Sequence, residues 1–208
     1  MIEFTYSRTD VPALAGLHAR AFPGFFLSGL GPQFLRQLYR GYIEDPTSII
    51  SLARGQDGQI IGICVGTLQP LGFYRRLLKR QFFGLCMASG LAAIRNPRAL
   101  PRLFAALAYR GDIPAGSTGA LLSSLCVEPE SQGTGLGRTL EENWRAIARV
   151  MGARAAFLTT DADDNEAVNR FYLSGGWGLH DQFVTRQGRR MNRFRYELTA
   201  APEGERPK

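Results

Sequence analysis

Three glycines on alternate positions mark the stretch of this sequence that is best suited to hold an anion. Residues 131–138 read SQGTGLGR, between an apolar run and a helical pattern. A glycine-rich turn from a strand into a helix lets backbone N–H groups and the positive end of the helix dipole converge on an anion. Arg138 occupies the third glycine position of the dinucleotide fingerprint G-x-G-x-x-G, so a nicotinamide site is not favoured. The turn is a candidate phosphate site, with a plain flexible turn as the alternative.

The elements around this turn alternate between strands and helices. Apolar runs and helical spacing predict a buried strand, a helix, a second strand, a second helix and a terminal hairpin. We expect them, in this order, over residues 120–127, 136–151, 153–160, 165–176 and 180–198. Glycines after both helices, and the pair Gln187-Gly188 in the hairpin, supply the turns.

The first part of the chain predicts a strand, two helices and an antiparallel hairpin. Alternation over residues 2–8 indicates the strand, and polar residues after it offer N-caps to the first helix. A loop rich in phenylalanine and glycine leads to the second helix, which begins near Pro32. The hairpin strands are expected over residues 48–53 and 59–68, around a Gln-Asp-Gly turn.

A long segment, residues 70–119, separates the two halves. Its second part puts leucine and phenylalanine on one helical face and arginine on another, and its first part is a longer apolar helix with a basic start. We interpret the segment as a helical hairpin inserted into the domain. The uncharged stretch from Gln81 to Ile94 is shorter than the ~20 residues needed to cross a bilayer.

The net charge of +7 comes from this insertion. Residues 73–110 hold eight basic residues and no acidic one, which leaves 17 basic and 18 acidic residues for the rest of the chain. The eight are Arg75, Arg76, Lys79, Arg80, Arg95, Arg98, Arg102 and Arg110. We therefore expect one local basic feature and no nucleic acid partner.

Composition and length indicate one globular domain. With 208 residues, 45% hydrophobic and 21% charged, the chain can bury a full core. We expect the domain to span residues 1–199 and the tail 200–208 to be disordered. The N-terminus lacks a basic region followed by an apolar one, so no secretory signal is visible and a cytoplasmic protein is expected.

Cysteine and histidine are too sparse to indicate a metal site. The three cysteines are far apart and set among apolar neighbours, which favours reduced, buried thiols over disulfides. They are Cys64, Cys86 and Cys126. His18 and His180 lie far apart in the sequence, so no metal is expected.

Two motifs, in this order and at this spacing, closely resemble the GNAT superfamily of acyl-CoA N-acyltransferases. The first, LSSLCVEPESQGTGLGRTL, resembles the family's strand followed by V-x-P, Q-x-x-G-x-G and a helix. It matches at Val127, Pro129, Gln132, Gly135 and Gly137. The second, NEAVNRFYLSGGW, resembles the family's N-x-A helix that ends in F-Y and G-aromatic. It matches at Asn165, Ala167, Phe171, Tyr172, Gly176 and Trp177.

This resemblance implies both a fold and an activity. It covers residues 120–178 in its motifs and residues 1–69 and 179–198 in the order of elements, but not 70–119, where the family usually has a short connection. The implied fold is α+β (α/β): a central mixed, mostly antiparallel, split β-sheet flanked by helices, here with an inserted helical hairpin. The implied activity is that of an N-acetyltransferase with acetyl-CoA as co-substrate.

The resemblance also places coenzyme A along the second half of the chain. Backbone N–H groups of residues 132–138 would cradle the pyrophosphate, leaving the side chain of Arg138 free at the mouth of the helix. The strand around residues 125–127 would pair with the pantetheine arm and offer an N–H to the thioester carbonyl. Tyr172 would protonate the departing thiolate, with plain core packing as the alternative. The implied cofactor contacts are Leu125, Cys126, Val127, Gln132, Gly133, Thr134, Gly135, Leu136, Gly137, Arg138, Asn165, Asn169, Phe171 and Tyr172.

The general base is where the sequence departs from the family pattern. Amine attack needs a free lone pair, so a carboxylate, or a water that it polarises, must take a proton from the ammonium. Some relatives carry a glutamate near the position of Thr160, and here Asp161 follows directly. We take Asp161 as the candidate base, and Glu128 as the alternative if its strand bulges toward the substrate. Asp163 and Asp164 are interpreted as helix-capping acids.

The insertion is expected to help select the acceptor amine. Arg75 with Lys79 and Arg76 with Arg80 are like-charge pairs at i,i+4, which repel unless solvent or an anion relieves them. A nucleotide-linked amino sugar would suit these cations and an aromatic-lined cleft. The residues expected in that cleft are Phe22, Phe25, Phe26, Phe73 and Tyr74. The layout is also similar to GNAT-type proteins of bacterial surface-polysaccharide pathways, although a helical hairpin with one wet face would explain the pattern as well.

Several other acceptors and partners stay open at this point. A peptide or protein amine would lie as an added strand between the halves of the split sheet. The apolar insertion would suit a longer acyl chain, a peripheral membrane contact, which we do not favour, or a homodimer. A module that binds acyl-CoA without catalysis is a further alternative.

Overall fold

Strands from both halves of the chain join in one β-sheet. The computed structural model describes residues 2–3, 6–73, 76–77, 118–185 and 188–198. Its seven strands run in the order β1-β2-β3-β4-β5-β7-β6, and among them β4 and β5 form the one parallel pair. This is the mixed, mostly antiparallel sheet that the sequence predicts.

The first half of the chain folds largely as predicted. Its elements are β1 (Ile2–Glu3), η1 (Arg8–Asp10), α1 (Val11–Ala21), α2 (Phe26–Gly29), α3 (Pro32–Glu44), β2 (Ser48–Arg54) and β3 (Ile60–Thr67). The strand expected over residues 2–8 does not reach its predicted end, because Ser7 caps η1 by accepting from the N–H of Thr9 (3.3 Å). The short helix α2 lies in a loop where no helix was predicted.

The second half follows the predicted order of elements. They are β4 (Ala120–Val127), η3 (Pro129–Ser131), α6 (Leu136–Val150), β5 (Ala155–Asp161), α7 (Glu166–Ser174), β6 (Gly178–Val184) and β7 (Arg190–Glu197). Gly152, with φ of +92°, follows the end of α6. The helical hairpin predicted over residues 70–119 lies outside the described residues except for its ends, and so does the tail 200–208.

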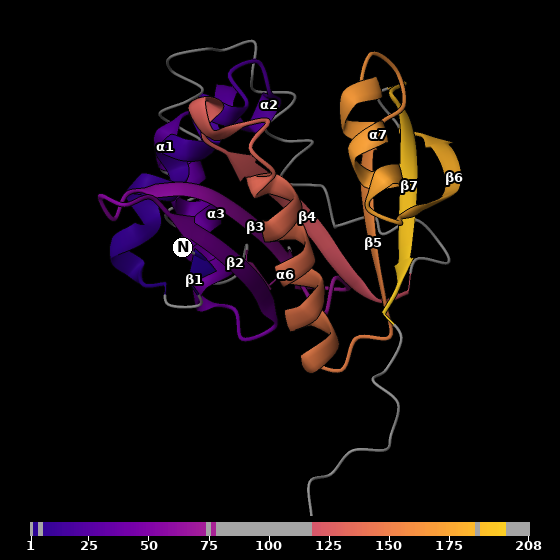
Figure 1. The fold of residues 1–208 in the computed structure, drawn as a ribbon, viewed down its shortest axis with the longest axis horizontal. Coiled ribbons are helices and arrows are strands. Elements are labelled where there is room, and N and C mark those ends of the chain that lie inside the picture. The colour runs from indigo at the N-terminus through magenta and orange to yellow at the C-terminus, as the bar shows by residue number, and fades with distance from the viewer. Residues whose placement is uncertain (1, 4–5, 74–75, 78–117, 186–187, 199–208) are drawn as a thin grey trace, which may run out of the picture.

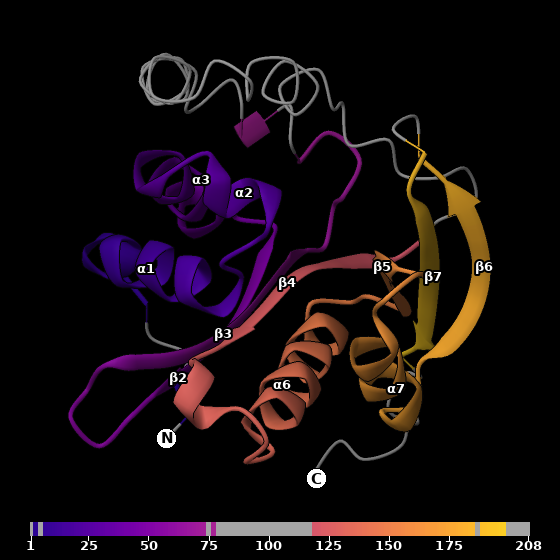
Figure 2. The same ribbon diagram turned by 90° about the horizontal axis from the view of Figure 1, so that it is seen from above.

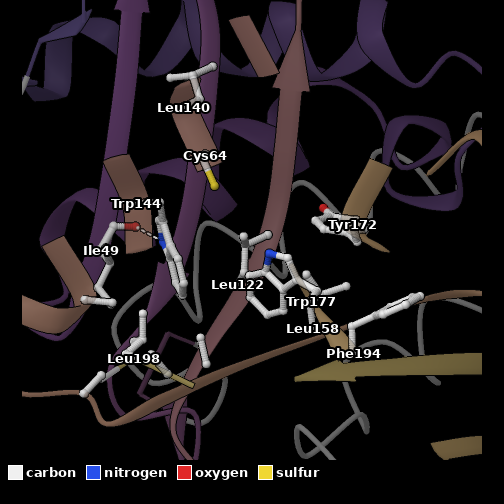
Figure 3. Close-up of a cluster of buried hydrophobic side chains, with 14 of the residues drawn as sticks. Ile49, Cys64, Leu122, Leu140, Trp144, Leu158, Tyr172, Trp177, Phe194 and Leu198 are labelled. Carbon is white, nitrogen blue, oxygen red and sulfur yellow. Dashed lines mark hydrogen bonds between the residues drawn. The ribbon is translucent and has the colours of Figure 1, made fainter. Parts of the chain in front are cut away.

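Helices cover both faces of the sheet. Figure 2 shows α1, α2 and α3 on one side, which we call the α1–α3 face, and α6 and α7 on the other, the α6/α7 face. Large aromatic side chains fill the core of the α6/α7 face, among them Trp144, Trp177 and Phe194 (Figure 3). Trp144 also donates its indole N–H to the carbonyl of Ile49 in β2 (3.1 Å). This bond fixes α6 against the first half of the sheet.

The strands β4 and β5 pair over a short stretch and then part. Their parallel register joins Ala120 to Ala156 and Leu121 to Phe157. Beyond these pairs β4 continues along β3, whereas β5 continues along β7. Figure 1 shows the two strands diverging from their paired ends. The sheet is therefore split, as the resemblance implies.

A β-bulge in β4 accompanies this parting. The partner of Gly66 in β3 is Leu122, and the next pair involves Ser124, so Ser123 is an extra residue in β4. A bulge bends its own strand, and this one lies two residues after Leu121, the last β4 residue that pairs with β5. Gly66 fits against the bulge because a Cβ there would lie 2.1 Å from the carbonyl oxygen of Leu121. The bulge gives a physical reason for the divergence.

Candidate active site

The glycine turn lies between the end of β4 and the start of α6. Gly133 and Gly135 have φ angles of +76° and +87°, a left-handed conformation that glycine adopts at little cost. Gly135 is the N-cap of α6, and no side chain caps this end of the helix. The side chain of Gln132 turns back and donates to the carbonyl of Val127 (3.1 Å). The first N–H groups of α6 therefore have no side-chain cap.

The turn also has room for an anion. A Cβ built at Gly133 or Gly135 would meet no other atom within 4 Å, and one at Gly137 would make only ordinary contacts from 3.6 Å. Thr134 keeps its hydroxyl within the turn, where it donates to the carbonyl of Ser131 (2.8 Å). Uncapped N–H groups at the positive end of a helix dipole attract negative charge. Space, donors and dipole together fit a phosphate group.

At the end of β4, two backbone N–H groups point away from β3. Glu128 donates its N–H to the carbonyl of Ile61 in β3 (2.8 Å). Because hydrogen-bonded and non-hydrogen-bonded positions alternate along an antiparallel strand, Val127 and Leu125 direct their N–H groups to the opposite edge. β5 has already left that edge. Two of the three strand residues predicted to contact the cofactor thus have donors where the strands part.

Cys126, the third of these residues, belongs to the core instead. Its backbone pairs with Ile63 of β3, so its N–H faces away from the parting. Its thiol is fully buried, 3.5 Å from the hydroxyl of Tyr39 and 3.4 Å from that of Ser124. Burial raises the pKa of the Cys126 thiol. Cys126 therefore packs in the core, and its contact with the cofactor stays a prediction without a free backbone donor to support it.

His18 completes a buried polar cluster that the sequence did not reveal. Its Nδ1 lies 3.0 Å from the hydroxyl of Tyr39 and 3.7 Å from Sγ of Cys126. Its Nε2 has no hydrogen-bond partner within the part of the chain that the structure describes. Burial lowers the pKa of His18 to about 4, so the ring is neutral at neutral pH. The sequence carries no signal for this cluster, because its members come from three separate elements.

Two asparagines hold α7 to the end of β5. Asn165 and Asn169 each donate from Nδ2 to the carbonyl of Asp161 (3.2 Å). The Oδ1 atom of Asn169 also accepts from Thr160 (2.7 Å) and from Asn192 (3.1 Å). The amide of Asn169 therefore helps to position α7, and its cofactor contact stays a prediction. Asn165 sits at the N-cap of α7, where its carbonyl end remains a candidate contact.

Tyr172 lies on the side of α7 that packs against the sheet. It is 6% exposed, and its ring centroid is 5.1 Å from that of Phe171, 5.9 Å from Trp177 and 6.0 Å from Phe194. Figure 3 shows its phenol oxygen directed toward β4. Burial raises the pKa of Tyr172 well above its ordinary value, so the phenol keeps its proton at neutral pH. The residue can therefore donate a proton beside the parted strands.

Arg138 points toward α7. Its Nη2 donates to the carbonyl of Phe171 and to Oγ of Ser174 (2.9 Å). The guanidinium lies over the ring of Phe171, 4.3 Å from the centroid, and its Nη1 is 3.4 Å from Glu141. The prediction that this side chain is free at the mouth of the helix is wrong, because α7 and Glu141 engage it fully. The backbone N–H of Arg138 stays a predicted phosphate donor.

Both carboxylates considered as the general base are held by arginines. Asp161 accepts two bonds from Nη2 of Arg189, at 2.7 and 2.6 Å. Glu128 accepts from Nε and Nη2 of Arg20 at 2.6 and 2.8 Å, and this contact lowers the pKa of Glu128. An arginine partner stabilises the charged form of a carboxylate, which makes Glu128 a weaker base. The bulge in β4 lies at Ser123 and not beside Glu128, so neither predicted base is unpaired.

The described aromatic residues of the predicted acceptor cleft lie partly in the core. Phe73 is fully buried and therefore does not line an open cleft. Phe22 and Phe25 pack around the buried histidine of α1, and Phe25 is 42% exposed. Tyr74 and the side chain of Phe26 lie outside the described residues. Among the described residues of this predicted cleft, only Phe22 and Phe25 remain as candidates.

Arg76 is the one basic residue of the insertion that the structure describes. Its Nε pairs with Asp45 (2.9 Å), and its Nη2 donates to the hydroxyl of Thr47 (2.9 Å). These bonds attach the start of the insertion to the end of α3 and the start of β2. The prediction that Arg76 helps to bind an anion is therefore corrected to a structural role.

Within the described residues, no group of three or more histidine, cysteine, aspartate or glutamate side chains could hold a metal ion. In the same part of the chain, no helix combines the length and the apolar character needed to span a bilayer.

The split sheet, the uncapped glycine turn and the buried phenol are together the features that the resemblance to acyl-CoA-dependent acyltransferases implies. The acetyltransferase (GNAT) family matches residues 12–177, so the chain belongs to the GNAT acetyltransferases, which are enzymes that use acetyl-CoA. No protein of curated function matches the chain in sequence.

Solved structures share the fold at low sequence identity. SsHAT has a TM-score of 0.67 and 21% identity, over 96% of this chain and 98% of that one. Aminoglycoside 6'-acetyltransferase type Ii has a TM-score of 0.62 and 15% identity, over 97% and 99%. The ribosomal-protein-S18-alanine N-acetyltransferase from Escherichia coli has a TM-score of 0.56 and 15% identity, over 99% and 98%. These likenesses concern the fold and leave the acceptor open.

Proposed function

We propose that this protein transfers the acetyl group of acetyl-CoA to a primary amine of a small molecule, by direct attack of the amine on the thioester. The observation that carries the proposal is the joint presence of an uncapped glycine turn after β4 and a protonated Tyr172 on α7. The turn supports binding of the acyl donor, and the tyrosine supports chemistry on it. A module that only binds acyl-CoA would need the turn but not the phenol.

Backbone groups of the second half would hold the donor. The N–H groups of residues 132–138 are suited to its pyrophosphate, and the N–H groups of Leu125 and Val127 to the arm and the thioester carbonyl. When bound, acetyl-CoA supplies an acyl group that is activated as a thioester. An N–H directed at the developing oxyanion contributes on the order of 100-fold or more to the rate.

Tyr172 would donate its proton to the departing thiolate, and the resulting tyrosinate would take up the proton that the attacking nitrogen loses as the amide forms. A positioned acid contributes roughly 100- to 10,000-fold to such a step. Since Asp161 and Glu128 are both held by arginines, we propose that the acceptor enters as the neutral amine. The rate should then rise with pH up to the pKa of the acceptor amine, because only the neutral amine has the lone pair for attack.

For the acceptor, we propose a small amine, with a nucleotide-linked amino sugar as the first candidate. The support is the basic insertion, which carries the whole net charge of +7. Arg76 is not available to an anion, because Asp45 and Thr47 hold it. The proposal on the amino sugar therefore rests on the other basic residues of that segment.

A screen for thiol release tests the proposal. The full chain is mixed with acetyl-CoA and a panel of amines: a nucleotide-linked amino sugar, an aminoglycoside, a polyamine and a peptide with a free N-terminus. We expect thiol release above the amine-free rate with at least one small amine. Activity confined to the peptide would overturn the small-molecule acceptor, and the absence of both turnover and acetyl-CoA binding would overturn the function itself.

A further inference from the structure

Arg138 joins the glycine turn to the helix that carries Tyr172. It is the third residue of α6, so its N–H is among the first donors of that helix. Its guanidinium donates to the carbonyl of Phe171 and to Oγ of Ser174 near the end of α7. The last carbonyls of a helix lack partners within the helix, and a cation there complements the negative end of its dipole. Arg138 thus belongs to the positive end of α6 and contacts the negative end of α7.

The buried carboxylate of Glu141 connects Arg138 to Trp177, which follows Tyr172 in the sequence. Glu141 is fully buried, and its Oε1 accepts from the indole N–H of Trp177 (2.8 Å). Its Oε2 lies 3.4 Å from Nη1 of Arg138 and 3.2 Å from Nη2 of Arg145. A buried carboxylate requires such partners, because an unpaired charge in the core is strongly unfavourable. The network therefore fixes Trp177 to α6.

Tyr172 contacts two rings that this network holds. One is Phe171, whose ring lies under the guanidinium of Arg138. The other is Trp177, which donates its backbone N–H to the carbonyl of Tyr172 (3.1 Å) and its indole N–H to Glu141. Both rings contact the phenol ring of Tyr172 edge-on. Displacement of the guanidinium would loosen both neighbours of the phenol.

The end of α7 is shaped around the guanidinium. A Cβ at Gly175 would lie 1.7 Å from Nη1 of Arg138, so any larger residue must displace that side chain. The φ of Gly175 is −86°, a value that every residue adopts. The glycine is therefore required by the position of Arg138 and not by the backbone.

We propose that Arg138 is a positioning residue that aligns Tyr172 with the acyl donor held by the glycine turn. Through Arg138, the N-terminus of α6, where the pyrophosphate would bind, is tied to the helix that carries the proposed acid. The inference rests on the proposed function and deepens it, because it names the residue that couples cofactor binding to proton donation.

The charges around Tyr172 support this role. Burial is the main cause that raises the pKa of Tyr172, Glu141 raises it further, and Arg138 opposes the rise. Loss of Arg138 would therefore make the phenol a weaker acid as well as a less ordered one. The contacts and the charge of Arg138 therefore both favour proton donation by Tyr172.

Three variants separate this role from general stability. Arg138→Met removes the guanidinium, and Gly175→Ala displaces it while leaving the charge in the chain. Arg145→Met is the matched control, since Arg145 also pairs with Glu141 but packs on Tyr196 and not on α7. Thermal unfolding of each variant checks that it is folded before kinetics are compared.

The kinetic test is a double-mutant cycle with Tyr172→Phe. It follows thiol release from acetyl-CoA with the fastest amine of the panel. Arg138→Met and Gly175→Ala should each lower kcat by about 10- to 100-fold, with KM for acetyl-CoA changed by less than about threefold. In the Tyr172→Phe background each should lower kcat by less than about twofold, because the residue through which Arg138 acts is already removed. Equal losses in both backgrounds, or an equal loss in Arg145→Met, would overturn the inference.

A second readout does not depend on turnover. In protein labelled with 3-fluorotyrosine, the resonance of Tyr172 is assigned by its absence in Tyr172→Phe. It should shift or broaden in Arg138→Met and Gly175→Ala but not in Arg145→Met. An unchanged resonance in the first two variants would refute the positioning role. Full activity of Tyr172→Phe alone would instead refute the proposed acid, so the two failures are distinguishable.

Discussion

Two regions of the molecule differ in the kind of polar group that they present. Around α6 these groups belong to the backbone: the start of α6 at Gly135, which no side chain caps, and the N–H groups at the end of β4 that point away from β3. On the α1–α3 face they belong to side chains: within the described residues Nε2 of His18 has no hydrogen-bond partner, and the carboxylate of Glu128 is held by Arg20. A backbone site depends on a few consecutive residues, whereas a side-chain site depends on partners such as Glu128 and Arg20, which lie 108 positions apart. The proposed cofactor site is therefore readable from local sequence, and the pairing of Glu128 with Arg20 is not.

Removal of the phenol should give the largest effect on the cofactor side. Tyr172→Phe keeps the buried ring but has no proton to donate, so kcat should fall by about 100- to 1,000-fold. Binding of acetyl-CoA, measured by calorimetry, should stay within about threefold because the backbone donors remain. An unchanged kcat would show that the phenol only packs in the core.

His18, buried on the α1–α3 face, should make the free energy of unfolding depend on pH in the acid range. The pKa of His18 is lowered by burial from 6.5 to about 4. Between these pH values the unfolded chain takes up a proton that the folded protein excludes, so the free energy of unfolding falls as the pH falls through this window, by up to about 3 kcal/mol from this group. Denaturant unfolding at several pH values measures this slope, and His18→Gln should flatten it. An equal slope in His18→Gln would refute the neutral, buried state of the ring.

Two glycines at opposite ends of α6 offer a matched comparison. Gly135 and Gly152 both have positive φ, and a Cβ at either would meet no atom within 4 Å. Alanine at each should lower the free energy of unfolding by about 1 kcal/mol, because of the left-handed backbone. Gly135→Ala should also weaken acetyl-CoA binding by about tenfold, since its Cβ enters the space proposed for the pyrophosphate. Equal affinities in the two variants would remove the turn from the cofactor site.

The smallest effect is expected at the carboxylate that the sequence singled out. Asp161→Asn breaks an ion pair with Arg189 that is partly exposed, so stability should change by less than about 1 kcal/mol. We expect kcat to stay within about threefold, because Arg189 engages both oxygens of this carboxylate. A loss of 100-fold or more, with no such loss in Asp163→Asn, would restore Asp161 as the base.

Much of the fold could be predicted because its signals are local. The apolar run at residues 120–127 gives β4 with the same bounds. The helix after the glycine turn begins at Leu136, as expected, and ends one residue before its expected end. The parting of β4 and β5 was predicted from the resemblance alone. Its physical cause, a bulge at Ser123 opposite Gly66, depends on the register between β3 and β4, which no local pattern encodes.

In the candidate site, too, some features follow from local sequence and others depend on the folded neighbours. The positions of Gly135, Leu125 and Tyr172 follow from motif and alternation, and their cofactor contacts remain predictions. The neighbours of Cys126, Asn169 and the Arg138 side chain were not predicted, because each depends on which groups surround it in space. Sequence spacing places a side chain on an element but does not say which neighbour will engage it.

A titration with two acyl donors tests the central claim most directly. Acetyl-CoA and S-acetylpantetheine share the thioester and the arm, but the second lacks the pyrophosphate that the glycine turn is proposed to hold. If backbone N–H groups of residues 132–138 bind that group through two or more charge-assisted hydrogen bonds, acetyl-CoA should bind at least about 100-fold more tightly than S-acetylpantetheine in calorimetry. Equal affinities, or no heat from acetyl-CoA at millimolar concentration, would contradict the account.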